Sequence, residues 1–132
     1  MSRTLAIAAS IWLAAVVSTV AVPAQTAWVT PDAEKAKKSP LPADKTYVEQ
    51  GEKLAKLNCA PCHGQLGKGD GAAAIALTPK PADWTAAPVQ QESDGELFWK
   101  ISTGRGAMPA WRHVPENERW ALIQYIRSLK GK

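Results

Sequence analysis

Residues 59–63 read Cys59-Ala60-Pro61-Cys62-His63 and contain both cysteines of the 132-residue chain. This spacing puts two thiols and an imidazole within about one helical turn of each other. Two cysteines are too few for the framework of several disulfides that stabilises many small secreted domains. The cysteine pair and the adjacent histidine therefore predict one shared chemical site.

The C-x-x-C-H spacing is typical of covalent haem attachment, in which two thiols add to the vinyl groups of one porphyrin edge and the next side chain reaches the iron. We therefore expect Cys59 and Cys62 to bind one haem c covalently and His63 to be an axial ligand. Three alternatives use similar residues. A thioredoxin-like couple needs a βαβ unit, a zinc site needs a fourth ligand such as His113 or a carboxylate, and a plain disulfide needs only the two thiols. None of the three explains the Gly/Pro-rich loops that follow the motif.

A helix is predicted just before the motif. Thr46 and Glu49 form a capping box, which predicts that the helix begins at Thr46. Gly51 falls in the middle of this helix, where glycine costs about 1 kcal/mol relative to alanine. Its presence suggests that another helix crosses closely at this point.

Two more helices are predicted after the motif. Ser93 and Glu96 form a second capping box, and Gly104 is placed to end the short helix that results. Pro115 suits the first position of a last helix, whose apolar residues repeat at i, i+3, i+4 and i+7: Leu122, Tyr125, Ile126 and Leu129. No convincing alternating strand lies between the helices. The predicted fold class is mostly α, with long Gly/Pro-rich loops.

With these segments in place, the chain resembles the monohaem class I cytochrome c family of the bacterial, periplasmic type. The resemblance covers nearly all of residues 46–132 and is carried by Gly51–Leu54, Cys59–Gly64, Gly69–Gly71, Met108–Trp111 and Arg119–Ile126. It implies a small helical domain wrapped around one covalently bound haem, with the first and last helices crossing. Gly51 would then lie opposite Leu122 and Tyr125.

The resemblance also implies a second axial ligand. The family's axial methionine sits in a Met-Pro-Ala-aromatic context like that of Met108, and Met1 is the only other methionine. His/Met ligation is the usual arrangement of a cytochrome c. Considered alone, a methionine is more often core filler, and His113 is the rival ligand.

Other residues are expected around the haem. A metal-bound imidazole usually donates its second N–H to a carbonyl, and the family often has proline at the position of Ala72 for this purpose. Ala72 leaves that carbonyl available but less rigidly placed. Three tryptophans could line the haem crevice or simply pack in the core: Trp84, Trp99 and Trp111. Two cations could contact the haem propionates or remain solvated surface charges: Arg105 and Lys80.

The N-terminal part of the chain has a different composition. Residues 1–24 predict a secretory signal peptide, with an apolar run and a Val22-Pro23-Ala24 cleavage site. The apolar run Leu5–Val22 also reaches the lower length limit for a retained membrane anchor. Residues 25–45 predict a Pro/Lys-rich linker, and residues 46–132 the cytochrome c domain.

The charge does not suggest a nucleic-acid partner. The formal net charge is +4, but residues 46–132 carry eleven Lys or Arg against nine Asp or Glu, a net of +2 that two haem propionates would cancel.

From the haem site and the export segment we expect a periplasmic electron carrier rather than an enzyme. This carrier would dock redox proteins at an exposed haem edge and would contact a membrane only if residues 1–24 are retained. The alternative is a fixed haem c subunit of a periplasmic dehydrogenase or terminal oxidase complex. An open-site haem enzyme or gas sensor is disfavoured by Met108, and no oligomeric state is predicted.

Export predicts a defined mature chain. Haem attachment through thioethers and the apolar leader both place maturation outside the cytoplasm, so the first residue of the mature protein should be Gln25. Intact-mass analysis of the exported protein measures this directly. A mass that still includes residues 1–24 would instead indicate a membrane-anchored cytochrome.

Overall fold

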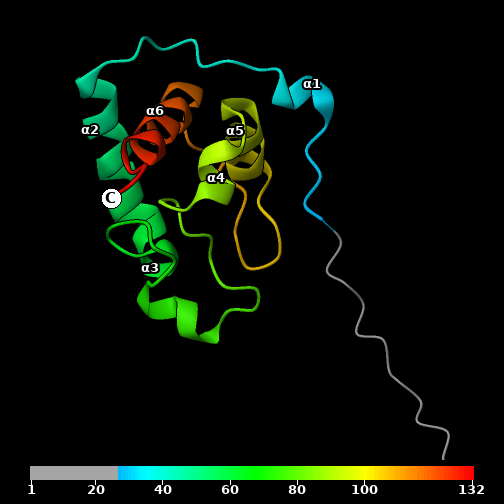
Figure 1. The fold of residues 1–132 in the computed structure, drawn as a ribbon, viewed down its shortest axis with the longest axis vertical. Helices are drawn as coiled ribbons and strands as arrows, with labels where there is room; N and C mark the ends of the chain where they lie inside the picture. Colours follow the sequence, from blue (N-terminus) through cyan, green and yellow to red (C-terminus); the bar gives the residue numbers. More distant parts are fainter. Residues whose placement is uncertain (1–26) are drawn as a thin grey trace, which may run out of the picture.

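The computed structural model describes residues 27–132, and the predicted signal peptide at residues 1–24 lies outside them. The described residues form helices joined by long loops, with no β-strand among them (Figure 1). The elements are α1 (Asp32–Lys35), α2 (Lys45–Leu54), a π-helical turn (Ala55–Cys59), α3 (Ala60–His63), a 3₁₀ turn (Ala72–Ala76), α4 (Ala87–Gln91), α5 (Asp94–Thr103) and α6 (Glu116–Ser128). The mostly α prediction is confirmed. None of the helices within residues 27–132 is long and apolar enough to span a bilayer.

Helices α2 and α6 cross with their backbones in close contact. Gly51 is buried, and a methyl group placed on it would lie 2.1 Å from the carbonyl oxygen of Ala121 and 2.9 Å from the Cα of Leu122. No side chain fits into that space. The predicted close crossing at Gly51 is therefore confirmed, with the Ala121 and Leu122 backbone as the contacting surface.

The core lies between α5, α6 and α2. The rings of Phe98 and Trp120 stack with their centroids 4.0 Å apart, which joins α5 to α6. Around this pair the buried apolar side chains form one cluster that includes Leu97, Ile101, Leu122, Ile123, Tyr125, Ile126 and Leu129. The α6 face predicted from the 3.6-residue period is thus the face that packs.

The helix ends agree with the sequence in part. The capping box of Ser93 and Glu96 is present, and Gly104 ends α5 with a φ of 62°, a left-handed conformation that glycine adopts without strain. The predicted cap at Thr46 is wrong, because the Asp44 carboxylate accepts the Thr46 N–H at 2.7 Å and α2 begins at Lys45. A carboxylate at this position satisfies a free amide and complements the helix dipole. Pro115 occupies the N-cap position of α6, without a side-chain cap bond, instead of forming its first residue.

Residues 27–44, most of the predicted linker, pack on the helical domain. They include α1, which contacts α5, and Thr30 is only 2% exposed. Figure 1 shows the chain leaving α1 and passing over the domain to reach α2. The composition of this segment did not predict that it docks.

The crossing at Gly51 predicts a strong effect of one methyl group. Gly51→Ala should lower the free energy of unfolding by about 1–3 kcal/mol, because the overpacking strain exceeds the gain in helix propensity. Denaturant titration of the haem-loaded protein measures the change, with the exposed Gln50→Ala of the same helix as control. A Gly51→Ala variant as stable as the unmodified protein would contradict the close contact.

Candidate haem site

The predicted attachment motif begins where α2 changes its winding. At Ala55–Cys59 the helix widens into a π turn, and the Asn58 side-chain amide donates to the Leu54 carbonyl at 3.2 Å. The single turn of α3 then carries Cys62 and His63. Because the close crossing fixes α2, the π turn and α3 hold both thiols and the imidazole in one short, ordered segment.

His63 is oriented by a hydrogen bond to a backbone carbonyl. Its Nδ1 lies 3.0 Å from the Ala82 carbonyl oxygen, and since a carbonyl only accepts, Nδ1 carries the proton. Nε2 is then the nitrogen with a free lone pair for a metal. The Trp84 ring stacks on the imidazole with a centroid distance of 4.6 Å and an interplanar angle of 24°. Burial lowers the pKa of His63, and the hydrogen bond to Ala82 opposes this only in part, so the neutral, metal-binding form is favoured.

The expectation that the Ala72 carbonyl would orient His63 is wrong. Ala72 is exposed and begins the 3₁₀ turn. The Ala82 carbonyl reaches the imidazole because the loop after α3 folds back: the Gly69 N–H donates to the His63 carbonyl at 2.8 Å, and the Trp84 N–H donates to the Gly67 carbonyl at 2.7 Å. These main-chain bonds bring residues 81–84 alongside residues 67–69.

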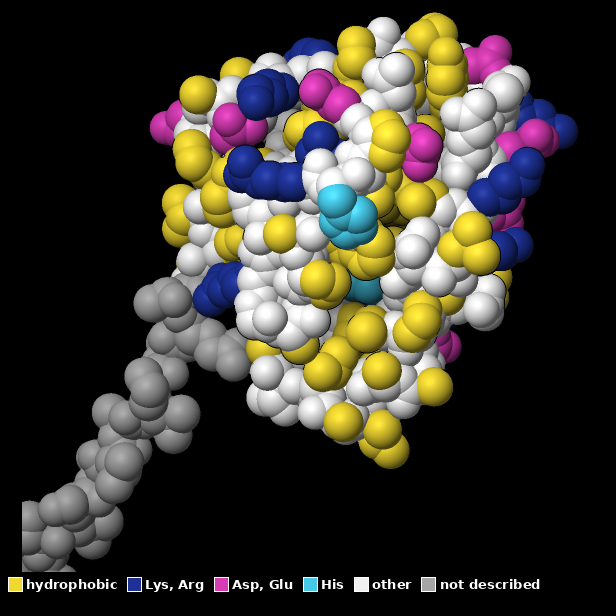
Figure 2. Space-filling model, turned by 180° about the vertical axis from the view of Figure 1, so that it is seen from behind, with side chains coloured by type: hydrophobic (Ala, Val, Ile, Leu, Met, Phe, Trp, Pro, Cys, Tyr) yellow, Lys and Arg dark blue, Asp and Glu magenta, His cyan; other side chains and the backbone are white. Residues whose placement is uncertain are grey.

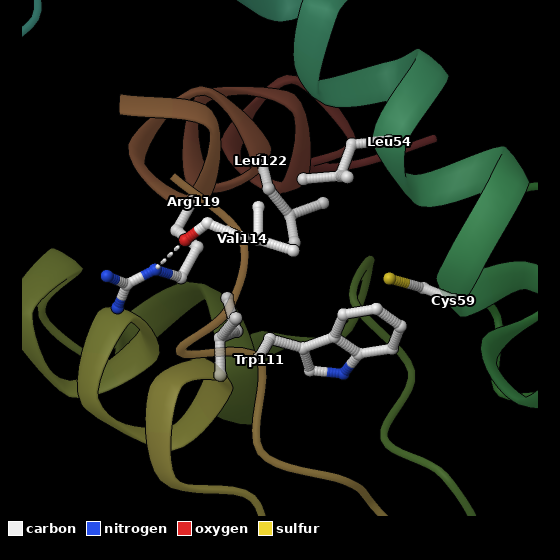
Figure 3. A pocket seen from close by; sticks show the side chains of 7 residues that line it. Leu54, Cys59, Trp111, Val114, Arg119 and Leu122 are labelled. Carbon is white, nitrogen blue, oxygen red and sulfur yellow. Dashed lines mark hydrogen bonds between the residues drawn. The ribbon is translucent and has the colours of Figure 1, made fainter. Parts of the chain in front are cut away.

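Cys59 faces an apolar wall. A small cavity of about 10 Å³ is lined by Cys59 together with Leu54, Ile101, Trp111, Val114, Arg119 and Leu122 (Figure 3). Burial raises the pKa of the Cys59 thiol to about 11, with a further contribution from Cys62, so the thiol is protonated at neutral pH. Both cysteines are free thiols and form no disulfide. On the side of the molecule opposite to Figure 1, histidine atoms lie in a hollow among hydrophobic side chains (Figure 2).

Met108 lies on a separate loop that packs on the same core. Its N–H donates to the Arg105 carbonyl at 3.0 Å, and the Arg105 N–H donates to the Met108 carbonyl at 2.8 Å. Met108 and Cys59 are both partly buried against the core cluster. His113 is exposed, with its ring 5.3 Å from that of Trp111. Of the two candidate ligands, Met108 is therefore the one packed against the core.

The other candidates have mixed outcomes. Trp84 contacts His63, and Trp111 lines the cavity beside Cys59. Trp99 packs against Trp28 instead, with ring centroids 6.3 Å apart. Lys80 donates to the carbonyls of the 3₁₀ turn, at 2.7 Å to Ala74 and 3.3 Å to Ile75.

Sequence reasoning missed one residue of the site, Ala82, because a backbone carbonyl leaves no side-chain signature. The only available signal was the pair of prolines, Pro79 and Pro81, just before it.

Within residues 27–132 no group of three or more His, Cys, Asp or Glu side chains is arranged to hold a metal ion. The alternative of a zinc site thus gains no support from the structure.

Residues 47–126 match the family model described as cytochrome c oxidase, cbb3-type, subunit III. The chain belongs to this family. It is also 37% identical, over 97 residues, to the cbb3-type cytochrome c oxidase subunit FixP of Bradyrhizobium diazoefficiens, covering 70% of this chain and 31% of FixP. The class I c-type cytochrome resemblance is therefore confirmed, although the chain spans only about a third of the length of FixP.

A solved structure agrees in fold with this cytochrome. A chain of the reducing HAO-like protein complex Kustc0457/Kustc0458 of Kuenenia stuttgartiensis superposes with a TM-score of 0.61 at 30% identity, over 69% of this chain and 47% of the other. Family membership supports haem c as the cofactor and electron transfer as the activity. The residues present fit that cofactor: two free thiols and an imidazole on adjacent turns, the imidazole with its Nδ1 already bonded and Nε2 available.

Proposed function

We propose that this cytochrome transfers single electrons by one haem c, attached covalently through Cys59 and Cys62 and ligated by His63 and Met108. The observation that carries the proposal is the bond from His63 Nδ1 to the Ala82 carbonyl, next to the two free thiols. A histidine that follows a C-x-x-C pair and is held in this tautomer has the arrangement of a metal ligand.

The haem, when bound, supplies one-electron exchange between ferrous and ferric iron. The protein's part is to hold both axial groups still. The hydrogen bond to Ala82 and the Trp84 ring fix the imidazole plane, and the paired backbone of Arg105 and Met108 holds the thioether loop. If His63 and Met108 both held the iron, no coordination position would be left for small molecules, which favours an electron carrier over an enzyme.

Location and partners follow from the same assignment. Thioether attachment and the predicted leader favour the periplasm, with a soluble mature chain preferred over an anchored one. The partners would be redox proteins that dock at the exposed haem edge. Nothing in the charge of residues 46–132 favours nucleic acid.

The family match favours a second candidate function. The matched family and FixP are both described as oxidase subunits, so the chain could deliver electrons to one fixed neighbour as a haem c subunit of a terminal oxidase. Purification of the tagged protein from solubilised membranes and from the periplasmic fraction separates the two. Recovery of the haem c in the periplasmic fraction, free of other subunits, supports a mobile carrier, and recovery with a membrane oxidase supports the subunit.

Attachment predicts a dependence of folding on both thiols. Cys59→Ser or Cys62→Ser should weaken or abolish covalent haem, and the double variant should be largely unfolded, because the cofactor completes the core. A pyridine haemochrome assay measures attachment, and circular dichroism measures helix content. A double variant with full helix content and cooperative unfolding would count against the proposal.

Ligation predicts the behaviour of Met108→Ala. The reduced variant should bind carbon monoxide, the oxidised variant should lose the weak far-red sulfur-to-iron band, and the reduction potential should fall, because a methionine sulfur favours the reduced iron. Absorption spectroscopy and redox titration measure these changes. His113→Ala is the matched control and should change none of them, and the opposite pattern would make His113 the ligand.

A further inference from the structure

The N-terminal strap, residues 27–44, lies outside the family match at residues 47–126 but is firmly docked. The Ser93 hydroxyl donates to the Lys35 carbonyl at 2.8 Å. A methyl group on Gly95 would lie 2.0 Å from the Glu34 carbonyl oxygen, so the strap backbone lies directly on α5. The strap is therefore part of the packed domain.

The other end of the strap is held by α6. The Gln124 amide donates to the Pro42 carbonyl at 2.9 Å, and Leu41 packs against the core cluster. The strap thus runs from α5 across the domain to α2, as Figure 1 shows.

Trp28 lies N-terminal to these anchors, two residues before Thr30, which is only 2% exposed. Its ring lies 6.3 Å from the Trp99 ring, between centroids. Two cations also face it, with Lys100 Nζ 5.7 Å and Arg105 Cζ 5.8 Å from its centroid. Cations within about 6 Å of an indole face are attracted by its quadrupole. Trp28 therefore joins the last turn of α5 to the first residues of the loop that follows.

Arg105 connects Trp28 to Met108. Two backbone hydrogen bonds join Arg105 and Met108, so a displacement of one residue moves the other. Gly104 packs on the same stretch, since a methyl group on it would lie 2.5 Å from the Met108 carbonyl oxygen. The loop of Met108 is thereby in contact with the strap through a single intervening residue.

We propose that Trp28 is a positioning residue for the axial methionine: by holding Arg105, it keeps the loop Gly104–Pro109 closed and slows the release of Met108 from the iron. The proposal rests on the proposed function in taking Met108 as the sixth ligand. The strap, which lies outside the family-matched residues 47–126, would then have a role in ligand exchange.

The experiment uses the exported, haem-loaded protein with Trp28→Ala, Trp28→Phe and the control Val29→Ala, an exposed side chain of the same strap. Two rates are measured: hydrogen exchange at the amides of Arg105 and Met108, and binding of imidazole to the oxidised iron, which requires Met108 to leave. Trp28→Ala should raise both rates about three- to tenfold, the scale of a lost cation–π contact. Trp28→Phe should keep both rates close to those of the unmodified protein, because a phenyl ring still faces the cations. Val29→Ala should have the same rates as the unmodified protein.

Three results would overturn the proposal. Rates in Trp28→Ala equal to those in Val29→Ala would remove the role of Trp28. An equal rise in exchange at the Ile123 amide of α6 would indicate general destabilisation in place of loop positioning. A far-red band missing from the unmodified protein would show that Met108 is not the ligand, which is a failure of the proposed function, distinct from the first two results.

Discussion

The contact between Gly51 and the backbone of Ala121 and Leu122 is the constraint on which the rest of the domain depends. Helices that approach this closely have little freedom to slide or rotate, because backbone meets backbone without an adaptable side chain between them. The position of α2 is thereby fixed relative to α6. The π turn and α3 follow α2 directly, so their position is fixed as well.

The π turn is where this fixed helix becomes a binding site. Wider winding over Ala55–Cys59 changes which residues face inward, and Cys59 comes to lie against the apolar wall formed by α5, α6 and Trp111. π turns occur mostly as single turns within α-helices and are frequent at functional sites. The imidazole of His63 is then oriented by the Ala82 carbonyl and by the stacked Trp84 ring, on a loop whose course is set by main-chain bonds at Gly67, Gly69 and Trp84.

How far the sequence predicts these features depends on the range of the interactions. The two thiols and His63 are close neighbours along the chain, and so are Ser93 and Glu96 of the capping box. Spacing along the sequence is therefore sufficient to predict how each group is placed. The Gly51 crossing was also predictable, because a glycine in mid-helix has a cost that needs a reason. Ala82 was not, since any residue supplies a carbonyl and its position depends on how a long loop folds. The docking of residues 27–44 was missed for a related reason. Composition shows too few apolar side chains, whereas the strap is held largely through its own carbonyls at Lys35 and Pro42.

The two sides of the proposed iron site are built by different means. The loop that carries Met108 has its near end tied to α5 through Gly104, whose N–H donates to the Lys100 carbonyl at 2.9 Å. Its far end is tied through Arg119, whose Nε donates to the Val114 carbonyl at 3.0 Å (Figure 3). Arg119 is 9% exposed, bonds the Ser102 hydroxyl, and lies with its guanidinium carbon 4.5 Å from the Phe98 ring centroid. Burial lowers the pKa of Arg119, and the charge of Glu116 opposes this only in part. Because a guanidinium retains its charge, the neutral acceptors and the ring face also offset its desolvation. A cation buried at that cost ties the segment after Met108 to both α5 and α6. The histidine side therefore depends on main-chain bonds within one loop and on the Trp84 ring, whereas the segment after Met108 also depends on a long side chain that reaches it from α6.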